Sequence, residues 1–144
     1  MKTKILSILI VIIISFSCKT DKKETVILKP NEFTNIQIEV LNGEKWVVDK
    51  PMMKIIQDIE KEVMQFDGNS LEDYNKLSNK ITKHLDVLTS SCTMTGQGHD
   101  ELHKWLLPFL DISKEFAKSK TLKDAQENYQ VIKHSFNLVD KNFK

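Results

Sequence analysis

The chain has 144 residues, with 21 basic and 20 acidic side chains and a net charge of +1. This length fits a single domain with one hydrophobic core. Every basic residue is lysine, and arginine is the residue that makes the bidentate contacts to phosphate and guanine. Nucleic acid is therefore a poor candidate partner.

The N-terminus has the order of a secretory signal. Lys2 and Lys4 precede an apolar run over residues 5–14, and small residues then lead to Cys18. The apolar run is shorter than the ~20 residues that a membrane-spanning helix needs. Residues 1–17 are therefore predicted to be a cleaved signal peptide.

The ending Ser17-Cys18 resembles a lipobox, the cleavage sequence of bacterial lipoproteins, although Ser15 and Phe16 depart from its usual residues. In that family the cysteine carries fatty acids such as palmitate and becomes the first residue of the mature protein. The charged, low-complexity start of segment 18–35 is typical of a tether. The resemblance implies a lipid anchor at Cys18, with an ordinary signal peptide as the alternative.

The implied location is the cell envelope, at the outer membrane. Lipoproteins exported to the cell surface carry several acidic residues just after the cysteine, but here Asp21 is followed by Lys22 and Lys23. The periplasmic face and the outer surface therefore both stay open.

Residues 36–48 are predicted to form a short β-hairpin or an extended arm. Apolar residues alternate with polar ones from Ile36 to Val40, and Trp46 and Val48 follow the pair Asn42-Gly43. Asn-Gly between two alternating runs is the strongest short hairpin signal. A lone hairpin is marginally stable, so this segment must pack on the rest of the domain.

Residues 49–144 are predicted to form an all-α, antiparallel up-down four-helix bundle, because the apolar period becomes helical and the connections are short. Asp49 with Pro51 indicates the first helix start, and Ser70-Asp73 and Thr121-Asp124 indicate capping-box variants. Pro108 is expected to kink the third helix. The four predicted stripes are Met52, Ile55, Ile56, Ile59, Val63 and Phe66; Tyr74, Leu77, Ile81, His84, Leu85 and Leu88; Leu102, Leu106, Phe109, Leu110 and Phe116; and Leu122, Ala125, Tyr129, Ile132, Phe136, Val139 and Phe143.

Sulfur and imidazole side chains gather at one end of this predicted bundle. Cys92 and Met94 lie in the loop before the third helix, His99 and His103 share a face in its first turns, and His84 lies across on the second helix. With Cys18 acylated, Cys92 has no disulfide partner in the chain. Thiolate, thioether and imidazole together suit Cu(I), and thiolate with imidazole also suits Zn(II). The sequence therefore predicts a lipid-anchored binding protein with a possible copper(I) or, less favoured, zinc site.

Each ligand also has an ordinary structural interpretation. Cys92 and Met52 can be core residues, His84 a hydrogen-bonded core histidine, and His99 a helix cap. The alternative function is a metal-free lipoprotein that binds another envelope protein. Such a module would expose an apolar patch, whereas a metal site would bring sulfur and nitrogen atoms together.

Two further functions are less favoured. A b-type haem protein of the cytochrome b562 kind would hold haem between Met52 and His134, but His134 lies off the apolar stripe of the fourth helix. An enzyme could use a Cys–His pair, but no orienting motif or substrate cleft is apparent, and Asp100-Glu101 is interpreted as favourable charge at a helix N-terminus. No catalytic residue is therefore predicted.

The segment from Cys92 to Pro108, and Gly43–Trp46 before the first helix, resemble small uncharacterised lipoproteins of Bacteroidota-type bacteria. The resemblance covers the bundle and its leading hairpin. It implies export and membrane anchoring, and it supplies no activity.

Overall fold

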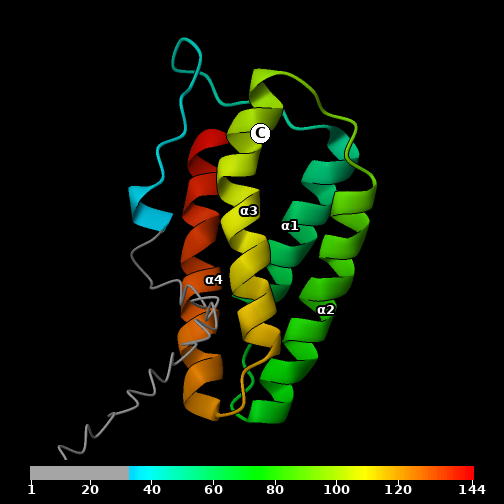
Figure 1. The fold of residues 1–144 in the computed structure, drawn as a ribbon, viewed down its shortest axis with the longest axis vertical. Helices are drawn as coiled ribbons and strands as arrows, with labels where there is room; N and C mark the ends of the chain where they lie inside the picture. Colours follow the sequence, from blue (N-terminus) through cyan, green and yellow to red (C-terminus); the bar gives the residue numbers. More distant parts are fainter. Residues whose placement is uncertain (1–32) are drawn as a thin grey trace, which may run out of the picture.

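The computed structural model describes residues 33–144, and four helices make up most of this part (Figure 1). The predicted signal peptide, Cys18 and nearly all of the predicted tether lie outside the described residues. After a 3₁₀ turn, η1, the helices follow in chain order: η1 is Phe33–Asn35, α1 Lys50–Met64, α2 Leu71–Ser90, α3 Gln97–Ala117 and α4 Leu122–Asn142. The predicted all-α four-helix bundle is confirmed.

The helices run alternately up and down (Figure 1). Each helix packs on the next one in the chain, α4 closes the bundle against α1, and α2 also contacts α4. The start of α1, the end of α2, the start of α3 and the end of α4 therefore lie at one end of the molecule, which we name the arm end because residues 36–48, the arm, lie there (Figure 1). No helix in the described residues has the length and hydrophobicity needed to cross a bilayer.

Local capping fixes two of the four helix starts. The Ser70 hydroxyl accepts from the Asp73 backbone N–H at 3.2 Å, and the Asp73 carboxylate accepts from the Ser70 backbone N–H at 3.1 Å, so the predicted capping box is present. Hydrogen bonds from the Ser70 hydroxyl and backbone lower the pKa of Asp73. Thr121 caps α4 by accepting from the Asp124 N–H at 3.1 Å. Asp49 occupies the N-cap position of α1 without a side-chain capping bond.

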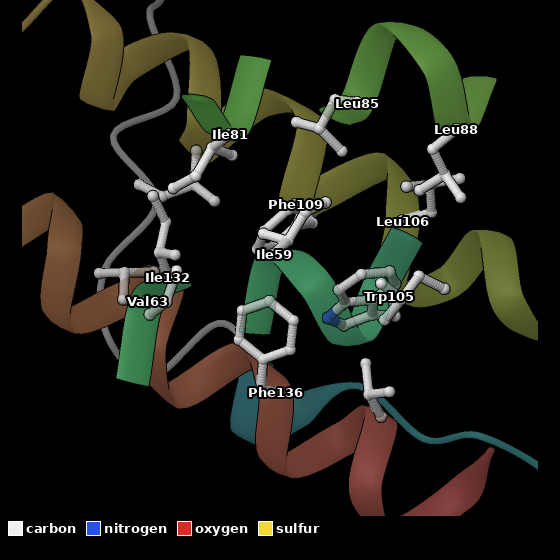
Figure 2. Close-up of a cluster of buried hydrophobic side chains, with 14 of the residues drawn as sticks. Ile59, Val63, Ile81, Leu85, Leu88, Trp105, Leu106, Phe109, Ile132 and Phe136 are labelled. Atoms are coloured by element: carbon white, nitrogen blue, oxygen red, sulfur yellow. The ribbon is translucent and has the colours of Figure 1, made fainter. Parts of the chain in front are cut away.

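The core contains most residues of the predicted stripes, and all four helices contribute to it (Figure 2). Its centre is aromatic: Trp105 and Phe109 of α3 stack with ring centroids 4.8 Å apart, and Phe136 of α4 meets Phe109 edge-on at 5.4 Å. Trp105 is fully buried, and its Nε1 has no hydrogen-bond partner among the described residues. The indole is therefore held by packing, and aromatic geometries of this kind stabilise a core beyond simple burial.

The buried faces differ from the predicted stripes at their edges. Three residues outside the predicted stripes, Trp105, Ile112 and Val131, are buried because α3 and α4 each pack against more than one neighbouring helix. Conversely, some predicted stripe residues are only half-buried or exposed: Ile55, Phe66, His84, Leu110 and Leu122. The apolar period of a single helix does not show how many neighbouring helices will cover it.

The helix α3 continues through Pro108, which has no N–H to donate to the preceding turn.

The predicted hairpin is reduced to a turn at the tip of an extended arm. Asn42 and Gly43 have φ angles of 55° and 76°, as a two-residue hairpin turn requires, and the Glu44 N–H donates to the Leu41 carbonyl at 3.1 Å. Beyond this bridge no ladder forms within the described residues. Trp46 pairs in parallel with Phe143 instead, so the two halves of the arm diverge.

Two neighbouring leucines of α3 test the assignment of the core. Leu106 is 4% exposed and Leu107 is 53% exposed. We expect Leu106→Ala to lower the free energy of unfolding by about 2–5 kcal/mol, because it leaves a cavity. Leu107→Ala is the control and should change it by less than about 0.5 kcal/mol. Urea unfolding followed by circular dichroism measures both, and equal effects would contradict the packing of α3.

Candidate functional site

The arm is tied to the end of the chain by backbone hydrogen bonds. The Trp46 N–H donates to the Asn142 carbonyl at 2.8 Å, the Lys144 N–H donates to the Trp46 carbonyl at 2.8 Å, and the Val48 N–H donates to the Lys144 carbonyl at 2.9 Å. The Lys45 ammonium also donates to the Asp140 carbonyl. These bonds hold the second half of the arm beside the end of α4.

Trp46 packs against the first turn of α3. Its indole lies so close to Gly98 that a Cβ atom at position 98 would be 3.2 Å from Cε3 of the ring. The indole Nε1 donates to the Glu39 carbonyl at 2.6 Å. The segments 43–46 and 92–108 therefore meet at this contact. Gly98 provides the space for the indole because it has no side chain.

Glu101 connects α3 to the first half of the arm. Its side chain is 4% exposed, yet both carboxylate oxygens are satisfied: Oε2 accepts from the Glu39 backbone N–H at 2.9 Å, and Oε1 accepts from the Lys104 ammonium at 2.8 Å. The hydrogen bond to Glu101 raises the pKa of Lys104. Interpreting Asp100-Glu101 only as charge near a helix N-terminus was therefore incomplete, because Glu101 also holds the arm.

An open hollow of about 670 Å³ lies between the arm and the loop 91–96. The Thr93 hydroxyl spans its edge by donating to the Asp49 carboxylate at 2.6 Å, which explains why Asp49 does not cap α1. Trp46 and Met94 supply apolar surface, and side chains such as Glu44 supply hydrogen-bonding groups. The arrangement can hold a ligand or a segment of a partner that has both apolar and polar groups.

The predicted histidine pair is present. The rings of His99 and His103 lie with centroids 4.0 Å apart and planes tilted by 48°, and both side chains are half-buried. The Nδ1 atom of His99 is 3.4 Å from the Asp100 carboxylate. Burial lowers the pKa of His103, and the charge of His99 lowers it further, whereas Asp100 raises it. The neutral form of the His103 imidazole, which is the form that binds metals, is therefore favoured.

Cys92 and His84 do not complete a cluster with this pair. Cys92 is a free, half-buried cysteine that packs against the hydrophobic core, as Met94 does. His84 lies with Nε2 3.6 Å from the Glu62 carboxylate, so its partner is on α1. Within residues 33–144, no three His, Cys, Asp or Glu side chains form a group that could hold a metal ion.

Met52 and His134, the two residues considered for haem binding, lie in different environments. Met52 is 1% exposed and belongs to the core, whereas His134 is exposed and its Nδ1 lies 3.3 Å from the Gln130 carbonyl of its own helix. Its exposure agrees with its position off the apolar stripe. Neither residue lines the hollow at the arm end.

Comparison with protein-family models, with curated proteins and with solved structures gives no match to this chain.

Sequence reasoning missed the two residues of α3 that position the arm. Glu101 precedes the buried Trp105 by four residues, so both lie on the same face of the helix. Placing Trp105 in the core would have indicated that Glu101 is covered. Gly98 gave no comparable signal, because its role depends on Trp46, which lies more than 50 residues earlier in the chain.

Removing the Glu101 carboxylate should release the first half of the arm. We expect Glu101→Ala to lower the free energy of unfolding by about 1–3 kcal/mol, because the Glu39 N–H and the Lys104 ammonium lose their acceptor. Hydrogen exchange at the Glu39 amide should become faster. The control is Glu127→Ala, which removes an exposed ion pair with Lys123 and should change stability by less than about 0.5 kcal/mol. Unchanged exchange at Glu39 would show that Glu101 does not hold the arm.

Proposed function

We propose that this chain is an exported lipoprotein of the bacterial cell envelope, anchored through Cys18, that binds its partner at the arm end of the bundle. The N-terminal order of basic residues, apolar run and Ser17-Cys18 carries the proposal of an anchor. The outer membrane is the proposed location, on its periplasmic or outer face. The likeness to Bacteroidota-type lipoproteins supports the same conclusion.

The exposed apolar side chains support the arm as the binding surface. Of the seven large hydrophobic side chains that are exposed in the described residues, three lie in the arm: Val40 at 41%, Leu41 at 58% and Val47 at 69%. The other four are on different parts of the helices. Apolar side chains grouped on one projecting segment are typical of an interaction site, whereas single ones are ordinary. This grouping favours the binding module over a metal carrier.

Substitution of Cys18 tests the anchor. We expect Cys18→Ala to abolish the incorporation of labelled palmitate in cells, because the cysteine at the predicted cleavage site, which the lipid would be attached to, is then absent. The precursor should keep its signal peptide, which mass spectrometry measures. Cys92→Ala is the matched control and should be labelled and cleaved like the unaltered chain. Palmitate labelling that persists in Cys18→Ala would refute the lipoprotein proposal.

A soft-metal site is the second candidate function, and the proximity of His99 to His103 supports it. Two imidazoles one helical turn apart can chelate one ion. Cys92, in the preceding loop, would have to move toward the pair to supply a thiolate, and Met94 from the same loop is the proposed thioether ligand. The candidate metal is Cu(I), since a thioether adds little to Zn(II) binding.

Metal titration under anaerobic conditions tests this second function. If the site exists, Cys92→Ser should weaken Cu(I) binding most, His99→Ala and His103→Ala next, and Met94→Leu less. The exposed His134 provides the control, because His134→Ala should leave the affinity unchanged. Chelators should not alter the helical circular dichroism, because the core is built of apolar side chains. Equal affinity in all variants would leave the metal function without support.

A further inference from the structure

A second, apolar groove lies between the arm and α1. Val47, Val48 and Met53 supply apolar side chains, and a space of about 470 Å³ opens above them. Val48 is buried, whereas Val47 is the most exposed large hydrophobic side chain in the described residues. Val47 also lines the hollow beside the arm, so the two recesses adjoin.

Three lysines surround this groove, and no acidic side chain lines it. Lys50 has no ion pair with any described residue. Lys54 pairs with Asp58 in the next turn of α1, and Lys144 lies 3.6 Å from the exposed Glu44 carboxylate. Lysine can lay its aliphatic stem on apolar surface while its ammonium stays in water. The groove therefore combines an apolar floor with a positively charged rim.

This chemistry fits an anionic lipid surface better than a protein. A phosphate group matches the ammonium of Lys50, and it can compete with the exposed carboxylates of Asp58 and Glu44 for Lys54 and Lys144. The glycerol and upper acyl region match the apolar floor. A specific protein interface buries about 800 Å² per partner, far more surface than the seven residues lining this groove offer. The turn of the arm projects beyond the ends of the helices (Figure 1).

The length of the chain before the bundle agrees with a membrane as the occupant, and this step rests on the proposed anchor at Cys18. Only 33 − 18 = 15 positions separate Cys18 from Phe33, where the described structure begins. Even fully extended, this segment spans at most about 50 Å. The bundle therefore stays within about 50 Å of the bilayer that holds its anchor.

We propose that the arm end is a membrane-contact surface, in which Val47, the groove behind it and Lys50, Lys54 and Lys144 bind anionic phospholipid headgroups. The contact orients the bundle with its arm end against the membrane. The opposite end, with the α1–α2 and α3–α4 connections, then points away from the bilayer.

Vesicle binding by the unlipidated chain tests this proposal apart from the anchor. The protein spans residues 19–144, which contain the whole described bundle and lack Cys18. We expect it to sediment with vesicles of phosphatidylcholine mixed with phosphatidylglycerol and not with phosphatidylcholine alone. Lys50→Gln should weaken binding about fivefold, as expected for one lysine at an anionic surface, and Val47→Asp should abolish it. Added salt should weaken binding further.

Matched substitutions at the opposite end serve as controls. Lys120→Gln removes one positive charge, as Lys50→Gln does, and Leu122→Asp replaces an exposed apolar side chain with a carboxylate, as Val47→Asp does. Both positions are near the start of α4, and both variants should leave vesicle binding unchanged. The proposal is overturned if the chain binds neither vesicle, binds both equally, or keeps its binding in Lys50→Gln and Val47→Asp. Capture by an envelope protein without vesicle binding would also overturn it. None of these outcomes affects palmitate labelling at Cys18, so the anchor proposal and the membrane-contact proposal can each be refuted without the other.

Discussion

The packing of Trp46 on the backbone of Gly98 holds the arm across the end of the bundle. A side chain at position 98 would meet the indole ring, and the indole N–H is in turn bonded to the Glu39 carbonyl in the other half of the arm. The buried Glu101 carboxylate then accepts the Glu39 N–H. The hollow and the apolar groove both depend on this arrangement, because arm residues form one wall of each.

The arm also explains why this end of the bundle is chemically unlike the other. The far end is closed by an aromatic cluster in which Phe66 lies 4.8 Å from Tyr74 and 5.4 Å from Tyr129, and the Tyr129 hydroxyl donates to the Val63 carbonyl. At that end Tyr74 and Tyr129 are buried and Phe66 is half-buried. In the arm, Val40, Leu41 and Val47 stay exposed, and Val47 lines a groove together with three lysines. Exposed apolar surface is retained where something else covers it.

The arrangement of the histidines limits what a metal could do here. His99 and His103 form a close pair, but His84 faces the Glu62 carboxylate, and the thiol of Cys92 packs with the core. A tight site needs a third or fourth donor, and ordering the loop to supply one costs conformational entropy. The pair alone is a modest chelate. The membrane-contact proposal needs no such rearrangement, because its groove is already formed.

The sequence by itself determined the four helices, the capping residues of α2 and α4 and most of the core, because these features depend on residues within a few positions of one another. The period of apolar residues and the Ser70-Asp73 and Thr121-Asp124 pairs needed no distant partner. The tight turn at Asn42-Gly43 was determined in the same way.

Only the tertiary structure decided the features that depend on distant partners. Trp105 is buried because α3 packs against both α2 and α4. The arm pairs with residues near Phe143 instead of with itself, since the end of α4 offers free backbone groups beside it. His84 pairs with Glu62 because α1 and α2 are adjacent. In each case the partner lies more than 20 residues away in the chain, so no local pattern could have identified it.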